Sequence, residues 1–360
     1  MSKVKQALTE IYNRLKQGGK RELSLDDKEA RFVIFSDLHK GASNRADDFR
    51  QNHPVYNAAV TSYYERGYSL IILGDAEELW QESPGRIFNA YRRTFELEGK
   101  FHKENRYNRA WGNHDIDWEE PDRFRNTIKN QFNTDHFADL TTSEGILFTV
   151  KHNGKEQGEL FLTHGHQGTL KSDILIPIAR RIVLWIWRPL QRLTGKTTNS
   201  PATRYDLREK HDRTMYEWAA ERDKMLLITG HTHRPVFCSQ THIGYLESEL
   251  AALEEKLSKT PQSKKLHEEI IEKKTEIEYR RTKDLGDTLT PSMDKPSYFN
   301  TGSCCYPDGD ITGIEICYEK GNRNRRAGVY IKLIRWSGRN GSVQNTVLRE
   351  RLLKDVFKTL

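Results

Sequence analysis

Short apolar runs alternate with helical segments over the first two thirds of the chain. Runs rich in leucine, isoleucine, valine and phenylalanine occupy residues 31–35, 69–73, 158–163 and 225–229. Helical patterns, such as that of residues 55–66, lie between them. Short buried strands separated by helices are typical of an α/β sheet. Such sheets bind ligands at the carboxyl ends of their strands, so the residues that follow each run are the candidates for function.

The last part of the main domain has a different pattern. Residues 297–306, 311–319 and 328–336 alternate like antiparallel strands, and "PDGD" between the first two is a candidate hairpin turn. These strands predict a second sheet. The fold class that we predict is therefore α/β, with two packed β-sheets flanked by helices.

The pattern divides the chain into three parts. Residues 1–30 hold an N-terminal helix, indicated by apolar residues at helical spacing, and a charged connector. Residues 31–346 form the main domain. Residues 347–360 are predicted to form a C-terminal helix.

Two insertions interrupt the main domain. Residues 168–224 are predicted to be a helical lid, and their apolar stretch 174–193 contains four arginines and two prolines, which excludes a membrane-spanning helix. Residues 244–284 are predicted to be an antiparallel helical hairpin, because leucine and isoleucine recur at helical spacing on both sides of "TPQS". The hairpin is either an element that binds a partner or a second copy, or a solvated decoration.

Composition indicates a reduced cytoplasmic protein. Charged residues make up 30% of the 360 residues, and the formal net charge of +7 favours anionic partners such as phosphates, nucleic acid or an acidic membrane surface. The four cysteines form no CxxC pair, and the N-terminus has charges where a signal peptide needs an apolar core. We predict a cytoplasmic location, with peripheral contact to the inner face of the membrane as an extension.

Carboxylate, amide and imidazole side chains follow the strand-like runs in five places. They are Asp37 and His39, Asp75, Asn113 and His114, His164, and His231 and His233. Oxygen and imidazole donors without cysteine suit Mn²⁺, Fe²⁺, Mg²⁺ or Zn²⁺ better than a structural thiolate site. Each motif alone also has a structural explanation, as a helix cap, a turn or a core histidine. Five motifs at five strand ends together favour a metal centre.

The five motifs resemble those of the calcineurin-like metallophosphoesterases. That family has the pattern DxH, GDxx(D/E), GNH(D/E), a histidine often followed by glycine, and GHxH. In this chain they read Asp37-Leu-His39, Gly74-Asp75-Ala-Glu-Glu78, Gly112-Asn113-His114-Asp115, His164-Gly165 and Gly230-His231-Thr-His233. The similarity covers residues 31–240 and the loop "FNTGS" at 299–303. It implies a four-layer sandwich and two divalent metal ions, with Mn²⁺ favoured.

The resemblance also implies roles for these residues. Asp75 bridges the two ions, which share a hydroxide that attacks phosphorus. One ion is completed by Asp37, His39 and His233, and the other by Asn113, His164 and His231. The leaving oxygen is protonated by His114, which Asp115 orients. By their positions, the candidates for substrate binding are Lys40, Asn44, Arg45, His166 and Trp185.

One subgroup is similar in more detail. "GDAEELW", "GHTHRP" and the helical insertion between them resemble the UDP-diacylglucosamine pyrophosphatases of lipid A synthesis. Trp185 and Trp187 beside arginines suit an acyl pocket or a membrane interface, and a helix packed on the core is the structural alternative. The chain departs from that subgroup at His114, where arginine is common, and in its added helices. We predict hydrolysis of a phosphomonoester, phosphodiester or pyrophosphate, with a lipid-linked UDP-diacylglucosamine-type substrate as the specific candidate.

Two other functions stay open. A nuclease or nucleotide phosphodiesterase of the same superfamily fits the net charge, although no stripe of lysines with interleaved aromatics marks a nucleic-acid surface. An inactive metal-binding scaffold with a partner-binding hairpin would keep the fold, but no residue of the motif set is missing.

Overall fold

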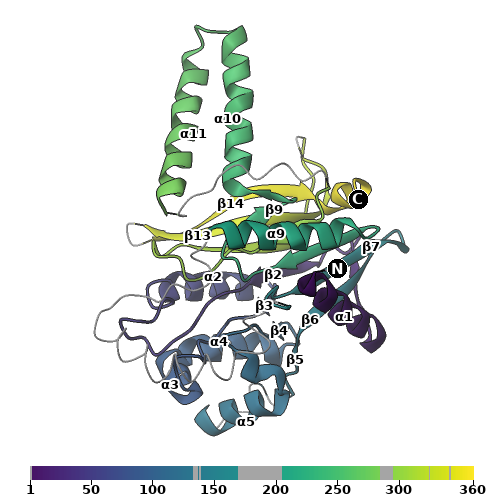
Figure 1. Ribbon diagram of the computed structural model, residues 1–360, viewed down its shortest axis with the longest axis vertical. Coiled ribbons are helices and arrows are strands. Elements are labelled where there is room, and N and C mark those ends of the chain that lie inside the picture. The colour runs from purple at the N-terminus through teal and green to yellow at the C-terminus, as the bar shows by residue number, and fades with distance from the viewer. Residues whose placement is uncertain are drawn as a thin grey trace.

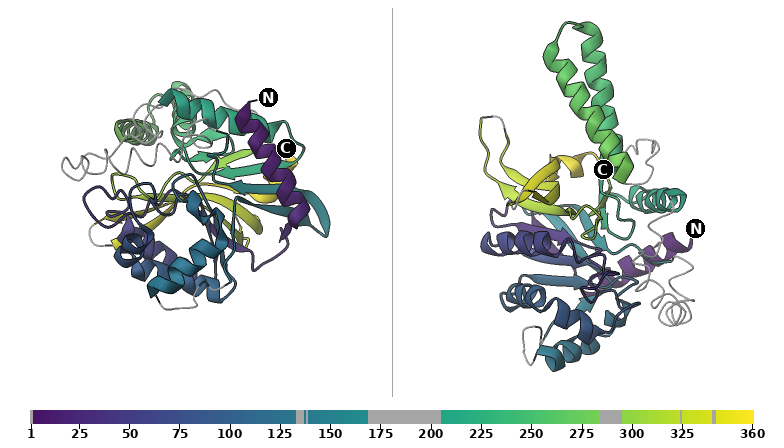
Figure 2. Two further views of the ribbon diagram at one scale, coloured as in Figure 1. Left: turned by 60° about the horizontal axis from the view of Figure 1, so that its bottom comes forward. Right: turned by 90° about the vertical axis from the view of Figure 1, so that its left-hand side faces the viewer.

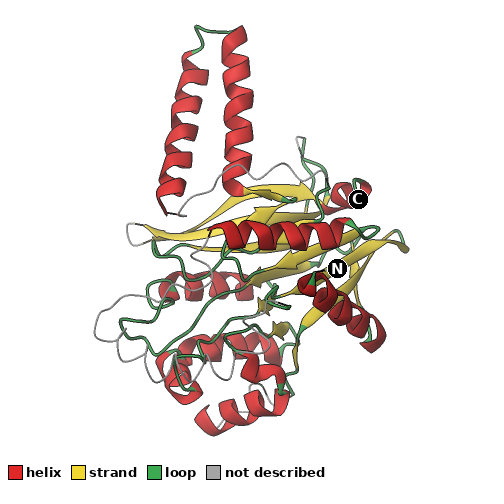
Figure 3. Cartoon of the chain, in the orientation of Figure 1, coloured by secondary structure: helices red, strands yellow, loops and turns green. Residues whose placement is uncertain are grey.

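Two mixed sheets of seven strands each pack face to face in this computed structural model (Figures 1 and 3). The structure describes residues 2–132, 137, 139–168, 205–283, 295–323, 325–339 and 342–360. Helices cover the outer face of each sheet, so the layers run helix, sheet, sheet, helix. This arrangement confirms the predicted α/β class with two packed sheets flanked by helices.

Sheet 1, in the order β14-β13-β12-β2-β3-β4-β5, carries the first three motifs. Its strands are β2 (Arg31–Phe35), β3 (Ser69–Leu73), β4 (Tyr107–Ala110), β5 (Thr142–Ser143), β12 (Ile311–Glu319), β13 (Gly328–Arg339) and β14 (Ser342–Leu352). The strands from β2 to β5 are parallel, with Val33 opposite Leu70 and Ile71 opposite Asn108. Their carboxyl ends therefore share one edge of the sheet.

Sheet 2, in the order β1-β6-β7-β8-β11-β9-β10, carries the other two motifs. Its strands are β1 (Arg21–Ser24), β6 (Gly145–His152), β7 (Lys155–Thr163), β8 (Met225–Thr229), β9 (Val236–Phe237), β10 (Gln240–Thr241) and β11 (Tyr298–Asn300). β7 and β8 are parallel neighbours, with Leu160 opposite Leu226. The fourth and fifth motifs therefore leave this sheet side by side.

Helices form the two outer layers. Sheet 1 is covered by α2 (His53–Glu65), α3 (Pro84–Ala90), α4 (Arg92–Lys103) and α5 (Pro121–Phe132), and η1 (Ile116–Glu119) precedes α5. Sheet 2 is covered by α1 (Lys3–Gly18) and α9 (Tyr205–Ala220). Strand β2 is apolar after Arg31 because both of its faces are buried: Val33 and Phe35 pack against the helices, whereas Ile34 packs between the sheets.

Two predictions about the chain ends need correction. The predicted helix at 347–360 is a strand as far as Leu352, and only α12 (Leu353–Lys358) is helical. The segment is a strand because it pairs along the whole of β13, from Arg339 opposite Ser342 to Tyr330 opposite Leu352. The predicted connector in residues 1–30 contains β1, which pairs in parallel with β6 and adds an edge to sheet 2.

The hairpin insertion consists of α10 (His242–Lys259) and α11 (Lys264–Lys283), which project together from the body (Figures 1 and 2). Ion pairs of Lys273 with Glu249 at 2.9 Å and of Lys274 with Glu254 at 2.8 Å join the two helices. Of the predicted lid at 168–224, only the ends are described. Residues 169–204, which include Trp185, Trp187 and the apolar stretch, lie outside the described residues. Within the described part of the chain, no helix has the length and apolar character needed to cross a membrane.

Candidate metal centre

The five motifs meet where the parallel strands of both sheets end. Their loops bond to one another: the amides of Asp37, His39 and Lys40 donate to the carbonyls of Gly74, Asp75 and Ala76 at 2.9–3.1 Å. The amide of Gly230 likewise donates to the carbonyl of His164 at 3.0 Å. The first motif is therefore fastened to the second, and the fourth to the fifth.

The backbone at this edge is strained. Five candidate ligands have φ values of 50–69°, the left-handed region that non-glycine residues rarely adopt; they are Asp37, His39, Asp75, His231 and His233. Strain of this kind costs about 1–3 kcal/mol per residue and persists where the surrounding structure enforces it, commonly at functional sites. The motif glycines are needed for space, because a Cβ at Gly112 would collide with Asp75 and one at Gly230 with Asp37.

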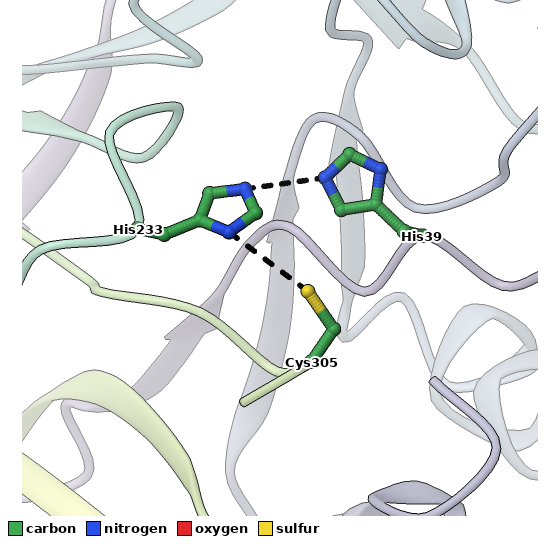
Figure 4. A group of neighbouring side chains, drawn as sticks. All are labelled: His39, His233 and Cys305. Carbon is green, nitrogen blue, oxygen red and sulfur yellow. Dashed lines mark hydrogen bonds between the residues drawn. The ribbon is translucent and has the colours of Figure 1, made fainter. Parts of the chain in front are cut away.

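A first group of donor atoms gathers around Asp37, His39 and His233. The Nε2 atom of His233 lies 3.1 Å from Asp37 Oδ1 and 3.2 Å from His39 Nε2 (Figure 4). His39 Nε2 is also 3.8 Å from Asp75 Oδ2. Two imidazole nitrogens and two carboxylate oxygens thus converge, an arrangement that a shared cation explains better than one shared proton.

A second group gathers around Asp75, whose donor atom lies within 4.8 Å of those of His164 and His231. His164 Nε2 is 3.1 Å from Asp75 Oδ2, and its Nδ1 donates to the carbonyl of Leu73 at 2.9 Å. This bond fixes the tautomer that leaves Nε2 available for an ion. Asn113 Oδ1 is buried without a hydrogen-bond partner among the described residues. Asp75 belongs to both groups, as a bridging carboxylate requires.

Burial and charge explain the electrostatics of these carboxylates. Asp37 is fully buried and Asp75 is 2% exposed. Burial alone would raise the pKa of Asp75, but His164, His114 and His39 hold that pKa well below its usual value. Burial likewise lowers the pKa of His39, yet Glu78, Asp75 and Asp37 raise it to about 10. The carboxylates are therefore ionised, and a divalent cation would replace protons on the surrounding imidazoles.

Glu78 and Trp80 position His114. Glu78 Oε2 lies 2.7 Å from His114 Nδ1 and 3.1 Å from His39 Nδ1. The Trp80 indole stacks on the His114 ring at 4.6 Å, and its Nε1 donates to the carbonyl of Asn113 at 2.7 Å. Our sequence analysis left Glu78 out of the site residues, although it stands at the last position of the motif "GDAEE".

The role that we expected for Asp115 needs correction. Instead of orienting His114, its buried carboxylate accepts the amides of Gly112 at 2.6 Å and Ala76 at 2.9 Å, and Arg109 Nη2 at 3.0 Å. It therefore shapes the backbone of the two loops that carry Asp75 and Asn113. Sequence proximity to His114 misled us, because the tight turn points Asp115 into the protein.

Lys40 is not placed to bind substrate, which corrects a second prediction. It is 0% exposed, and its ammonium lies 3.2 Å from Glu77 Oε1 and 3.1 Å from Glu98 Oε1. Glu98 comes from α4, distant in sequence, so the first motif gave no sign of this pairing. Glu77 also binds Arg109, which connects the ion pairs to Asp115 behind the centre.

The other predicted substrate residues differ in position. Asn44 donates to Glu82 at 3.2 Å and lines an opening beside His39, whereas Arg45 is exposed. His166 is 3% exposed, 5.4 Å ring to ring from His164, and burial lowers its pKa to about 3. Trp185 lies outside the described residues. The opening beside His39 is acidic, being lined also by Asp47, Asp48, Glu78 and Glu82.

One cysteine, Cys305, lies beside the centre. Cys305 Sγ is 3.9 Å from His233 Nδ1, on the side of the ring opposite His39 (Figure 4). Burial raises the pKa of the Cys305 thiol well above its usual value, so sulfur is present there as a thiol rather than a thiolate. Cys304 is fully buried in the core, as its small apolar character suggested.

Helix α9 contributes two residues that no motif indicated. Asp212, 1% exposed, accepts Thr232 Oγ1 at 3.2 Å and Arg234 Nε at 3.0 Å, so the helix is attached to the loop of the fifth motif. The ring of His211 lies 5.2 Å from that of His231. A lone histidine and aspartate on a charged helix gave no sequence signal for either contact.

Comparisons with known proteins agree with this geometry. A family model described as calcineurin-like phosphoesterase matches residues 30–235, more than half of the chain. A solved structure, a dimetal phosphatase from Danio rerio, matches over 90% of this chain and 100% of that chain, with 10% sequence identity and a TM-score of 0.33. A similarity at this TM-score supports no conclusion about this protein. None of the curated proteins matches the chain.

Proposed function

Because the chain belongs to the calcineurin-like phosphoesterases, a family that binds two divalent metal ions, we propose that it hydrolyses phosphate esters with a dinuclear metal centre. One observation carries the proposal: Asp75 faces both groups of donor atoms, His39 at 3.8 Å and His164 at 3.1 Å. A carboxylate shared in this way is what two neighbouring ions require.

Different residues of the chain would hold the ions and donate the proton. Two bound ions would supply a nucleophile near neutral pH and neutralise the phosphoryl oxygens. Asp37 and Asp75 provide the negative charge that holds divalent cations, and His164 is fixed in the tautomer that presents Nε2. His114, held by Glu78 and stacked on Trp80, would give a proton to the leaving oxygen. The ion that we propose is Mn²⁺, in keeping with a set of carboxylate, amide and imidazole donors.

For the substrate, we propose a nucleotide-sugar pyrophosphate of the UDP-diacylglucosamine type. The support is the sequence similarity of "GDAEELW" and "GHTHRP" to enzymes of that class. A nucleotide phosphodiesterase is the second candidate, favoured by a histidine rather than an arginine at position 114. The acidic opening beside His39 speaks against a long nucleic acid, whose phosphates Asp48 and Glu82 would repel. The membrane contact and the partner of the hairpin stay predictions.

The test is a hydrolysis panel with the Mn²⁺-loaded protein. It compares an aryl phosphomonoester, an aryl phosphodiester, a UDP-sugar and single-stranded DNA, each before and after chelation. We expect hydrolysis that is lost on chelation and in Asp75→Asn, and kept in Glu315→Gln, which removes a carboxylate far from the centre. If a fully loaded protein hydrolysed none of the four, the metal-binding scaffold would be the better conclusion.

A further inference from the structure

One imidazole beside the candidate metal centre has a buried nitrogen that no other described residue binds. His211 of α9 bonds to the backbone of Gly165 through one ring nitrogen. Among the described residues, its Nε2 is buried and has no hydrogen-bond partner. Nδ1 is therefore the nitrogen that donates to the Gly165 carbonyl, and in a neutral imidazole Nε2 is then an acceptor. His164 has the same arrangement, with Nδ1 held by a backbone carbonyl and Nε2 left for the centre.

The neighbouring residue fixes the place of this imidazole. Asp212 bonds to Thr232 and Arg234 in the fifth motif and to Tyr298 OH at 2.8 Å. These bonds hold α9 against the loop between His231 and His233. Buried polar atoms are nearly always paired, so an unpaired one that a rigid anchor keeps beside a reactive centre points to a ligand.

We propose that His211 contacts the substrate on the side of the centre formed by His164 and His231, where Nε2 accepts a hydrogen bond from a hydroxyl or N–H group near the phosphate. The inference rests on the proposed function and narrows it to phosphate esters whose organic part carries such a donor, as sugars and nucleosides do. In the described part of the chain, His211 is not among the side chains whose donor atoms gather within 4.8 Å of one another, which favours contact with substrate over coordination of an ion.

Two substitutions test the contributions of the two ring nitrogens of His211 separately. In His211→Asn, the amide still reaches the Gly165 carbonyl, but nothing occupies the place of Nε2. In His211→Gln, the longer side chain puts an amide oxygen near that place. Lys210→Asn is the control, because Lys210 is exposed on the same helix and the change introduces the same residue, at a cost in helix propensity no smaller than that of His211→Asn.

The measurement is the dissociation constant of three phosphates for the Mn²⁺-loaded protein. Uridine monophosphate and N-acetylglucosamine phosphate carry donors, and phenyl phosphate carries none. We expect His211→Asn to weaken at least one of the first two by about fivefold to tenfold, the usual worth of one hydrogen bond, and to leave phenyl phosphate within about twofold. His211→Gln should recover part of the loss, and Lys210→Asn should match the parent.

Three results would overturn this inference. They are an equal loss for all three phosphates, no loss for either donor-bearing phosphate, and a lower metal content in His211→Asn by mass spectrometry, which would assign the side chain to an ion. Each leaves the phosphoesterase proposal standing, because that proposal is decided by hydrolysis and not by these affinities.

Discussion

Two clusters of three candidate ligands in this protein differ in the groups that neutralise their carboxylates. One consists of Asp75, His164 and His231, and the other of Glu315, Cys317 and Glu319, which alternate along β12. In the β12 cluster, the Lys332 ammonium lies 2.9 Å from Glu315 Oε1 and also pairs with Glu319. The protein thus supplies its own cation there.

The metal centre has no lysine or arginine among its described donors, and its internal positive charge comes from imidazoles that hold protons. Asp75 faces imidazole nitrogens that are candidate ligands, and Asn113 Oδ1 is left unpaired among the described residues. Buried charge must be compensated, either by the protein or by something that it binds. The comparison therefore identifies a candidate binding site by imidazole protons that a metal ion can replace, rather than by the number of acidic residues.

The largest effect should follow from removing the shared carboxylate. Asp75→Asn should weaken binding of both ions and lower turnover by more than about 10³-fold, because both groups of donors share this carboxylate. Glu315→Gln should leave the metal content and turnover unchanged. Metal content is measured by mass spectrometry and turnover on the best substrate of the panel. Retention of both ions by Asp75→Asn would refute the bridging role.

The next prediction distinguishes the loss of proton transfer from the loss of metal binding. His114→Ala should keep the ions and slow hydrolysis of an alkyl ester by about 10²–10⁴-fold, the usual contribution of acid catalysis. An aryl ester, whose leaving group needs less protonation, should lose less. Glu78→Gln should reproduce part of the loss, since Glu78 holds the His114 ring. Equal losses on both esters would argue against His114 as the proton donor.

A third substitution removes the lysine that neutralises the β12 cluster, so that this cluster, like the candidate metal centre, could bind a metal ion. Lys332→Met removes the internal cation from a buried pair and should lower the free energy of unfolding by about 3–5 kcal/mol. Added Zn²⁺ should restore part of that stability, because two carboxylates then lack a counter-charge and the Cys317 sulfur offers a third ligand. Urea unfolding with and without Zn²⁺ measures both effects. Stability unchanged by the substitution would show that the pair contributes nothing.

The smallest expected effect is on the pH dependence of stability. Burial raises the pKa of Glu315, but Lys332, Cys317 and Tyr63 outweigh it and hold that pKa below its ordinary value of 4.5. The folded state therefore binds the proton less readily than the unfolded state. Its stabilising contribution is complete above the ordinary pKa and is lost as the pH falls through the folded value. Unfolding free energies of the parent and Glu315→Gln should differ at about pH 7 and converge as the pH falls below the folded pKa of Glu315; a constant difference would contradict this.

The sequence predicted the parts of the site that depend on local order. Each motif directly follows a strand, so parallel pairing alone brings Asp37, Asp75 and Asn113 to one edge. Roles that depend on distant partners could not be predicted this way. Lys40 looked available until Glu98 of α4 was seen to hold it, and His211 acquires its neighbours only through the docking of α9.

The two errors of secondary structure have the same origin. The tail after residue 347 has a helical pattern but pairs with β13, and the connector before residue 30 adds the edge strand β1. In both places, a pairing partner far along the chain overrides local preference. The same reasoning explains Asp115, whose direction is set by the amides of Gly112 and Ala76 rather than by its neighbour His114.

The bonds that fasten the first motif loop to the second have a consequence for how the centre opens. The amides of His39 and Lys40 donate to the carbonyls of Asp75 and Ala76. Neither loop can therefore detach without breaking the hydrogen bonds that join it to the other loop. We therefore expect the two loops to unfold as one cooperative unit together with β2 and β3, although they are formally irregular segments. In hydrogen exchange, these amides should behave like those of a central strand, and the vacant ligands should stay gathered while an ion leaves and another arrives.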